Sequence, residues 1–243
     1  MNLVVDMGNT RTKVALFVND QLFASYQYEK NPLPEIKKLL SVHPEIRRAI
    51  LSSVIQHSKE VVNFLQHKTN FHFFDSSTLL PFPIFYKTPH TLGRDRLAAA
   101  AAAFKLSEGN NALSIDAGTC IKFDLILKDK GYIGGSISPG IKMRYQALNH
   151  FTDQLPLFSP DIDFNLICGR STEESIRAGV QKGAVLEVLG LINEYKKQYP
   201  DLFIVICGGD APFFELATKN SIFVCPHLVL LGLNEILNFN VVK

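Results

Sequence analysis

The sequence predicts an α/β protein built from two similar halves. Short β-branched strands alternate with helical segments along the whole chain. A strand that ends in Asp-x-Gly occurs twice, first as Leu3-Val4-Val5-Asp6-Met7-Gly8 and again, near the middle of the chain, as Leu113-Ser114-Ile115-Asp116-Ala117-Gly118. A near-repeat at about half the chain length indicates a duplicated unit. We therefore expect two α/β halves with mixed sheets, residues 1–108 and 109–243, and a ligand cleft where they meet.

Composition excludes several classes of protein. Of 243 residues, 47% are hydrophobic, enough for a sizeable core. The 25 basic and 23 acidic residues form no like-charge block that would serve as an arm for nucleic acid or membrane. The cysteines form no C-x-x-C pair, which argues against a zinc site or a disulfide framework. No signal-peptide pattern or apolar stretch of about 18 residues is present, so we expect a soluble, reduced, cytosolic protein.

The opening hairpin is the first candidate site. Gly8-Asn9 tolerates the positive φ of a tight turn, and Gly8 lets a phosphate approach the backbone. The hydroxyls of Thr10 and Thr12 and the ammonium of Lys13 can donate to phosphate oxygens. Asp6 would repel phosphate unless Mg²⁺, with its waters, lies between them. The predicted phosphate loop is Asp6-Met7-Gly8-Asn9-Thr10-Arg11-Thr12-Lys13; the alternative is an ordinary solvent-facing hairpin.

The rest of the first half alternates strands and helices up to a proline-rich loop. Strands are expected over 21–28, 48–54 and 71–74, with one helix opened by Pro32 and Pro34 and another capped by Ser58. Residues 75–92 hold too many prolines for a regular element. The aromatic residues Phe82, Phe85 and Tyr86 argue against disorder there. A long ordered loop of this kind is usually functional.

A strong helix follows this loop. Gly93-Arg94-Asp95-Arg96 opens it, and six consecutive alanines, residues 98–103, favour helix and allow close packing. That packing partner is either a helix of the same chain or the same helix of a second copy across a two-fold axis. Asp95 at the helix start is a candidate general base, and the alternative is a simple N-cap.

The second half repeats the pattern of the first. Strands are expected over 113–117, 121–127 and 132–137, and a glycine-rich turn precedes a helix over 141–148. Ser171-Thr172-Glu173-Glu174 has the spacing of a capping box and predicts the start of a long helix. The strand 203–207 ends in Gly208-Gly209-Asp210, where backbone can approach a nucleotide, and residues 228–237 form the last apolar helix.

Four motifs together resemble type III pantothenate kinase. They are Asp6-x-Gly8-Asn9-Thr10-x-x-Lys13, Gly93-x-Asp95-Arg96, Asp116-x-Gly118-Thr119 and Gly208-Gly209-Asp210, and in this order they cover nearly the whole chain. The resemblance implies the acetate and sugar kinase/actin superfamily, with two duplicated actin-like (ribonuclease H-like) halves. It implies ATP-dependent phosphorylation of pantothenate, the first step of coenzyme A synthesis, by a homodimer that needs Mg²⁺ with ATP and a monovalent cation, K⁺ or NH₄⁺.

The same resemblance implies roles for individual residues. Residues 6–13 would bind the ATP phosphates, with Asp6 on Mg²⁺ directly or through water, and Thr119 would also contact ATP. Asp95 would be the proton acceptor, and Asp116 would bind the monovalent cation. Pantothenate would contact Tyr86, Gly93, Arg94, Asp95, Arg96 and Thr172, the last from the partner subunit.

The chain departs from the family pattern in two places. Cys120-Ile121-Lys122 stand where the family usually has small hydroxyl-bearing residues, and Ser171 stands where it often has Asn. The details of the second phosphate loop therefore need not follow the family. Two rivals stay open: another small-molecule kinase of the superfamily, and a regulatory nucleotide-binding protein. The absence of a basic patch or DNA-binding helix pair argues against direct DNA contact.

Overall fold

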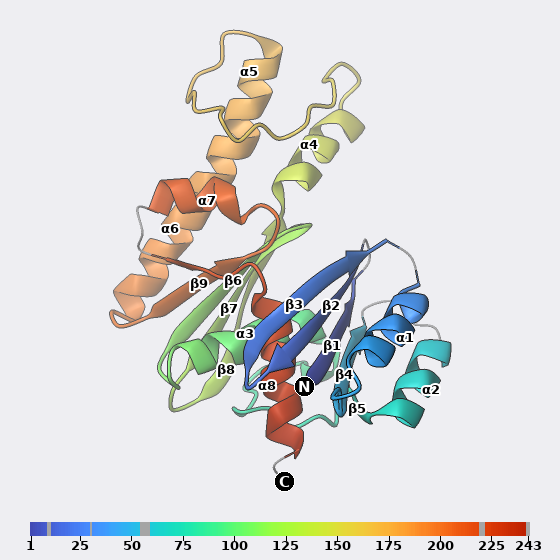
Figure 1. The fold of residues 1–243 in the computed structure, drawn as a ribbon. Coiled ribbons are helices and arrows are strands. Elements are labelled where there is room, and N and C mark those ends of the chain that lie inside the picture. Colours follow the sequence, from blue (N-terminus) through green and yellow to red (C-terminus); the bar gives the residue numbers. More distant parts are fainter. Residues whose placement is uncertain (9–10, 30, 54–58, 219–221, 242–243) are drawn as a thin grey trace. The chain divides into compact units, whose positions relative to one another are not determined.

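A computed structural model describes residues 1–8, 11–29, 31–53, 59–218 and 222–241 (Figure 1). The chain divides into two compact units. The first comprises residues 1–106 and 227–243, and the second comprises residues 107–226. Each unit is one five-stranded mixed sheet with helices packed on it, which confirms the predicted α/β fold of two similar halves.

The first unit holds five strands and four α-helices among its described residues. In chain order they are β1 (Asn2–Met7), β2 (Thr12–Val18), β3 (Gln21–Tyr28), α1 (Leu33–Val42), β4 (Arg48–Ser53), α2 (Lys59–Lys68), β5 (Asn70–Phe73), the 3₁₀ turn η1 (Pro89–Thr91), α3 (Arg94–Leu106) and α8 (Leu228–Val241). The strand predictions are confirmed here. Four residues covered by sequence predictions, Asn9, Thr10, Val54 and Ser58, lie outside the described residues.

The sheet of the first unit has the order β3-β2-β1-β4-β5. The first three strands are antiparallel, while β1, β4 and β5 are parallel. Alternate residues of β1, such as Leu3 and Val5, face the core with Ile36 of α1 and Leu65 of α2, and all four side chains are fully buried. Figure 1 shows α1 and α2 together on this face. Asp6 therefore belongs to the opposite face.

The second unit repeats this arrangement. Its elements are β6 (Ala112–Ala117), β7 (Cys120–Leu127), β8 (Gly131–Pro139), α4 (Ile141–His150), α5 (Thr172–Arg177), the π-helical turn η2 (Ala178–Lys182), α6 (Gly183–Gln198), β9 (Phe203–Cys207), α7 (Ala211–Thr218) and β10 (Phe223–Val224). The strand order β10-β9-β6-β7-β8 matches that of the first sheet, with β6 in the place of β1. The structure thus confirms the internal repeat.

The repeat extends to the register of the two hairpins. Asp6 pairs with Lys13 across β1 and β2, and Asp116 pairs with Lys122 across β6 and β7. The turn between the paired residues runs over 8–11 in the first unit and over 118–120 in the second, so the second turn is one residue shorter. This explains why Lys122 is one place nearer its Asp in sequence yet remains its cross-strand partner.

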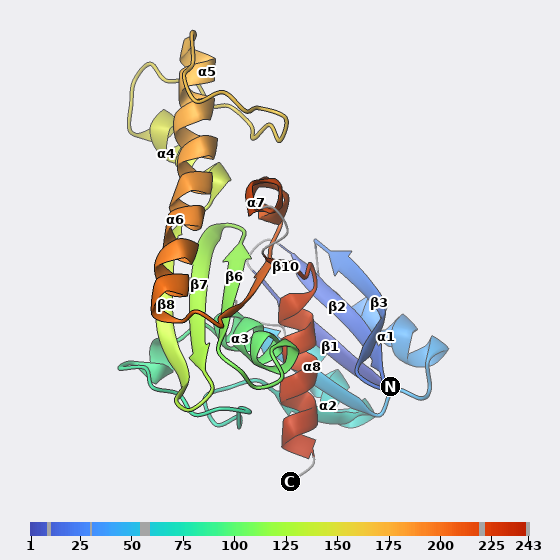
Figure 2. The ribbon, with the colours of Figure 1, turned by 90° about the vertical axis from the view of Figure 1, so that its left-hand side faces the viewer.

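The C-terminal helix differs from the expected division of the chain. The sequence analysis placed residues 109–243 in the second half, but α8 belongs to the first unit. It packs on α3, as Figure 2 shows, and Gly232 allows this close approach because a Cβ there would collide with the Ala98 backbone. The six alanines of α3 are at most 2% exposed within the single chain. The same-chain alternative therefore holds, and the alanine face is not available to a second copy.

A polar network joins α8 to the rest of the first unit. Lys105 of α3 forms ion pairs with Asp20 and with Glu235 of α8. Asp20 and the preceding Asn19 both have positive φ, as a two-residue hairpin turn between β2 and β3 requires. Asn238 of α8 donates to Asp20 at 2.6 Å. Burial opposes ionisation of Asp20, but the hydrogen bonds from Lys105 and Asn238 outweigh it and lower the pKa of that carboxyl.

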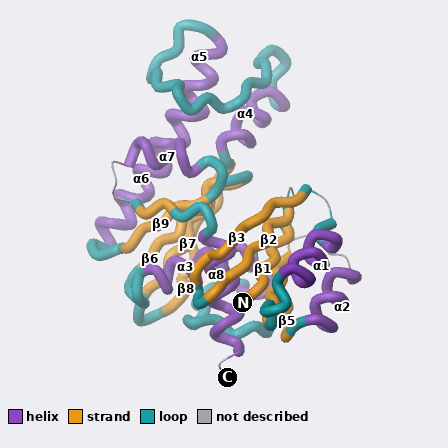
Figure 3. Tube along the Cα trace, in the orientation of Figure 1, coloured by secondary structure: helices purple, strands orange, loops and turns teal. Residues whose placement is uncertain are grey.

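The long helix predicted from the capping box is formed, with one π-helical turn inside it. Ser171 accepts a hydrogen bond from the Glu174 N–H, and the Glu174 carboxylate accepts one from the Arg170 N–H, so the cap is confirmed. The π-helical turn η2 joins α5 to α6, which follow one another as a continuous coil in Figure 2. Within it, Gln181 is buried and accepts hydrogen bonds from the Tyr145 hydroxyl and the Asp161 N–H. These bonds fasten the irregular segment 151–171, which Figure 3 draws as a loop.

Among the described residues, no helix is both long enough and apolar enough to cross a lipid bilayer.

Candidate active site

The first candidate site lies at the carboxyl ends of the parallel strands in the sheet of the first unit. In open α/β sheets, ligands commonly bind at this edge. Asp6 and Met7, at the end of β1, are register partners of Ser52 and Ser53, at the end of β4. The Ser53 carbonyl accepts a hydrogen bond from Nη1 of Arg94 at 3.4 Å. The opening hairpin and the Gly93-Arg94-Asp95-Arg96 block therefore meet at one edge of one sheet.

The described part of the hairpin has the form of a compact turn. The Gly8 N–H donates to the Arg11 carbonyl at 3.1 Å. Asp6 and Lys13 are half-buried, Thr12 is buried, and Arg11 is exposed and donates to Gln27 of β3. The turn keeps a carboxylate and an ammonium side by side at the strand ends, as a metal–phosphate site requires.

A cavity of about 490 Å³ lies beside this edge. It is lined by the end of β4, the end of β5, the segment after β5 and the start of α3, including Ser53, Phe73, Asp75, Gly93 and Arg94. The Arg94 guanidinium stacks over the Phe73 ring at 5.8 Å from its centre. A pocket of this size, with a guanidinium and backbone groups in its wall, suits a small anionic molecule.

Asp95 lies in the first turn of α3 and is half-buried. The helix begins at Arg94, so Gly93, not Asp95, is the N-cap residue, and the interpretation of Asp95 as a simple cap is wrong. A Cβ at Gly93 would lie 2.6 Å from Oδ1 of Asp95, so the carboxylate bends back over Gly93. The glycine thus leaves the space that this carboxylate occupies.

Arg96 and Tyr86 are paired. Arg96 is only 6% exposed, and its guanidinium lies 6.0 Å from the centre of the half-buried Tyr86 ring. The pair ties the proline-rich loop to the start of α3. The family resemblance implies substrate contacts for both residues, and the structure places their side chains together.

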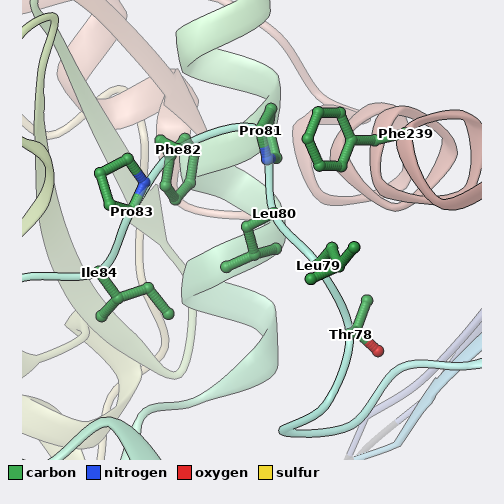
Figure 4. Close-up of a pocket in the computed structure, with 8 residues that line it drawn as sticks. All are labelled: Thr78, Leu79, Leu80, Pro81, Phe82, Pro83, Ile84 and Phe239. Carbon is green, nitrogen blue, oxygen red and sulfur yellow. The ribbon is translucent and has the colours of Figure 1, made fainter. Parts of the chain in front are cut away.

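The proline-rich loop has two parts. Residues 78–84, with Phe239 of α8, line an apolar pocket of about 400 Å³ (Figure 4). Leu79 exchanges two hydrogen bonds with the Asn240 side chain, and Phe82 packs edge-on against Phe104. This part is fastened to α3 and α8 and offers no charged group. Residues 89–92, by contrast, line the cavity beside Arg94.

Several polar residues of this cavity were not predicted from the sequence, among them Ser53 and Asp75. Asp75 follows β5 directly, so the rule that finds Asp6 at the end of β1 would have found it too. Hydrogen bonds from the Ser77 hydroxyl and N–H lower the pKa of Asp75, which keeps it anionic at neutral pH. The cavity wall therefore carries one negative and one positive group.

In the second unit, three backbone segments crowd around the turn 118–120. A Cβ at Gly140 would lie 2.1 Å from the Gly118 carbonyl oxygen, and one at Gly208 would lie 2.1 Å from that of Ala117. Gly208 also has a φ of +97°, which glycine alone adopts without strain. Asp210 accepts from the Ile141 N–H at the start of α4. Burial raises the pKa of Asp210, and this hydrogen bond opposes the rise only in part.

Asp116, at the end of β6, forms an ion pair with Lys122. Oδ2 of Asp116 and Nζ of Lys122 are 2.6 Å apart, and the two side chains are 19% and 16% exposed. Thr119 is exposed in the turn beside them. Thr172 is also exposed, at the start of α5.

No group of three or more His, Cys, Asp or Glu side chains that would hold a metal exists in the part of the chain that the structure describes. A magnesium ion that keeps several waters and binds mainly to phosphate oxygens needs only one protein carboxylate. Asp6, at the strand end beside Lys13, fits that requirement.

Two duplicated mixed sheets, each with an Asp-x-Gly hairpin, define a protein of the actin-like and sugar kinase fold class. A putative N-acetylmannosamine kinase from Listeria monocytogenes is 13% identical, with a TM-score of 0.59 over 98% of this chain and 99% of that one. A putative Baf family transcriptional activator from Campylobacter jejuni is 20% identical, with a TM-score of 0.62 over 99% and 100%. Both likenesses concern the fold alone.

Sequence comparison gives the family. Residues 2–194 match the family model of type III pantothenate kinase. A protein named Type III pantothenate kinase from Christiangramia forsetii is 44% identical over 99% of both chains. The chain belongs to the type III pantothenate kinase family.

Proposed function

We infer that the chain transfers the γ-phosphoryl group of ATP to the primary hydroxyl of pantothenate, at the carboxyl edge of the first sheet. The observation that carries this is family membership over the full length, together with an intact Gly93-x-Asp95-Arg96 block beside the cavity. The reaction is the first step of coenzyme A synthesis.

Asp95 is the proposed general base. The hydroxyl oxygen of pantothenate attacks the γ-phosphorus in line, and the bond from that phosphorus to the β–γ bridging oxygen breaks as ADP leaves. The hydroxyl proton passes to the Asp95 carboxylate. Gly93 supports this role because the space above it lets the carboxylate bend back over the helix start.

The hairpin of residues 6–13 is the proposed phosphate site. Gly8 permits close approach of the phosphates, while Thr10, Thr12 and Lys13 donate to their oxygens. Thr119, exposed in the second hairpin, is a further proposed contact to ATP. Mg²⁺ would enter with ATP, held by Asp6 directly or through water, and would neutralise part of the phosphate charge.

Pantothenate is an extended molecule with a carboxylate at one end and the reacting hydroxyl at the other. The guanidinium groups of Arg94 and Arg96 are candidate partners of its polar groups, and Tyr86 holds Arg96 in place. The cavity of about 490 Å³ has the dimensions of a small-molecule site.

A homodimer is proposed to complete the pocket, with Thr172 contributed by the partner subunit. Support comes from the second unit, where Phe151 is 81% exposed and Ile167, close in sequence to Thr172, is 78% exposed. Exposed apolar side chains of this size mark interaction surfaces when they gather. The four free cysteines suit a reducing compartment, which supports action in the cytoplasm.

The direct test is to incubate the purified protein with ATP, Mg²⁺ and pantothenate, and to follow 4′-phosphopantothenate by mass spectrometry. Parallel reactions with N-acetylmannosamine and with glucose test the alternative that the chain is a different small-molecule kinase. ADP formation with a sugar but not with pantothenate would replace the proposal. ATP binding without any transfer would favour the regulatory alternative.

A further inference from the structure

The Asp116–Lys122 ion pair changes what the second hairpin can bind. The two residues are register partners on adjacent strands, so their side chains leave the sheet on the same face. Their charged atoms are 2.6 Å apart and both side chains are largely buried. On β9, the register partner of Asp116 is the neutral Cys207, so the strand neighbour that supplies positive charge is Lys122.

A potassium ion does not fit this arrangement. K⁺ would need an Asp116 oxygen as a ligand, but that carboxylate already accepts a charge-assisted hydrogen bond from the Lys122 ammonium. An ion added there would stand within a few ångströms of a second positive charge, in a partly desolvated place where like charges repel strongly. The monovalent-cation site that the family resemblance implies at Asp116 is therefore not supported by the residues present.

We propose that the Lys122 ammonium takes the place of the monovalent cation at Asp116, so that this chain works without K⁺ or NH₄⁺. An alkylammonium carries the same single charge as either ion and presents N–H donors as NH₄⁺ does. Tethered to β7, it is present in every molecule at unit occupancy. The inference rests on the proposed function in one respect: the phosphate charge that the cation would offset is that of ATP.

The crowded backbone around the pair supports this role over that of an ordinary surface ion pair. Gly140 lies against the Gly118 carbonyl and Gly208 lies against the Ala117 carbonyl, with no room for a side chain at either glycine, so the backbone beside the pair is closely packed. The shorter second turn keeps Lys122 opposite Asp116. A surface ion pair, by contrast, would be exposed and would require neither feature.

The first test detects the ion itself. Crystals of the wild type and of Lys122→Thr are grown with rubidium chloride, and anomalous scattering from Rb⁺, a probe for K⁺, is measured at Asp116. Thr is chosen because it suits a strand, leaves room beside the carboxylate and adds an oxygen ligand. No peak is expected in the wild type, and a peak is expected in the variant. Lys130→Thr, which removes an exposed lysine from the turn after β7, is the matched control and should show no peak.

The second test measures turnover in potassium chloride and in tetramethylammonium chloride at equal ionic strength. The wild type and Lys130→Thr should run at the same rate in both salts. Lys122→Thr should be on the order of 10²-fold slower in the organic salt, the cost typical of losing one electrostatic stabiliser, and K⁺ should restore much of the rate.

Rb⁺ at Asp116 in the wild type, or several-fold activation of the wild type by K⁺, overturns the proposal, and neither measurement needs a variant that folds. A folded Lys122→Thr that neither binds Rb⁺ nor responds to K⁺ also overturns it, because Asp116 would then be no cation site at all. If neither the wild type nor the two variants phosphorylate pantothenate, the proposed function is wrong. The Rb⁺ diffraction result still tests this inference, because it does not depend on turnover.

Discussion

Gly232 of α8 lies against the backbone of Ala98 in α3: a Cβ on Gly232 would be only 1.7 Å from the Ala98 carbonyl oxygen. Since a carbonyl of a buried helix cannot move aside, any side chain here must push the two helices apart. The close approach depends on both partners, a glycine on one helix and small residues on the other.

Gly232→Ala should therefore destabilise the protein. Overpacking typically costs about 1–3 kcal/mol, and the better helix propensity of Ala recovers only about 1 kcal/mol. The measurement is equilibrium unfolding in urea. Gly190→Ala in α6 is the matched control, since a Cβ there meets nothing within 4 Å, and it should stabilise the protein slightly. Equal effects of the two substitutions would contradict the packing argument.

Asp95→Asn should fold normally and lose turnover. The amide keeps the size of the carboxylate but cannot accept the hydroxyl proton, and a positioned base contributes about 10²–10⁴-fold. Steady-state kinetics and the unfolding transition are measured together. A kcat near that of the wild type would remove Asp95 from the role of base.

Gly93→Ala should reduce kcat without a large loss of stability. The new Cβ would meet Oδ1 of Asp95 at 2.6 Å, and the flexible carboxylate, not the backbone, would give way. A displaced catalytic group of this kind costs up to about 10²-fold. Gly183→Ala, where a Cβ meets nothing, controls for backbone entropy. If Gly93→Ala is fully active, the position of the Asp95 carboxylate over Gly93 has no part in the reaction.

Asp210→Asn should stabilise the protein at neutral pH, and the gain should shrink as the pH falls. Burial raises the pKa of Asp210 above the ordinary value of 3.8, so the native state binds a proton more readily than the unfolded state. The contribution of this group to stability is therefore complete below the ordinary pKa and is lost as the pH rises through the raised one. The amide oxygen can still accept from the Ile141 N–H.

The measurement for Asp210→Asn is the free energy of unfolding from pH 7 down to about 4, with the wild type alongside. Asp129→Asn, at an exposed carboxylate after β7, controls for the loss of one negative charge. A gain that grows as the pH falls would contradict the assigned direction of the pKa.

Sedimentation should show a dimer at micromolar concentration, and mixing two inactive variants should recover activity. Asp95→Asn removes the proposed base, and Thr172→Arg blocks the proposed contact from the partner subunit. A mixed dimer has one site in which both Asp95 and Thr172 are intact. An active monomer would end the dimer proposal, whereas a dimer with proven subunit exchange and no recovery would end only the shared site.

Most of the fold could be predicted because its signals are local. Apolar strands that end in Asp-x-Gly mark β1 and β6, and the Ser-x-x-Glu cap marks the start of α5. The placement of α8 could not be predicted, because the sequence of an apolar helix does not indicate which of the two sheets the helix belongs to. Only Gly232, a glycine inside that helix, hints at a close neighbour. The helix α7 and the short strand β10 were missed, and η2 leaves the apolar pattern of the long helix almost unchanged.

Asp6 and Asp95 could be named as candidates from residue type and position, whereas the contact between Tyr86 and Arg96 is seen only in the structure. The predicted site was incomplete where the role of a residue depends on its distance from another residue. The sequence identified Lys122 as a departure from the family pattern, but the consequence required the 2.6 Å separation from Asp116. Asp75 was not predicted because it opens the proline-rich loop and no Asp-x-Gly pattern marks it as the end of a strand.

The return of α8 to the first unit has a consequence for biosynthesis. Residues 107–226 are contiguous, so the second unit can fold as soon as the ribosome has released them. The first unit is begun before the second and completed after it, because α3 must wait for α8, which follows the second unit in the chain. Until then the alanine face of α3 is uncovered, and a nascent chain stopped short of α8 would expose it to chaperones and proteases.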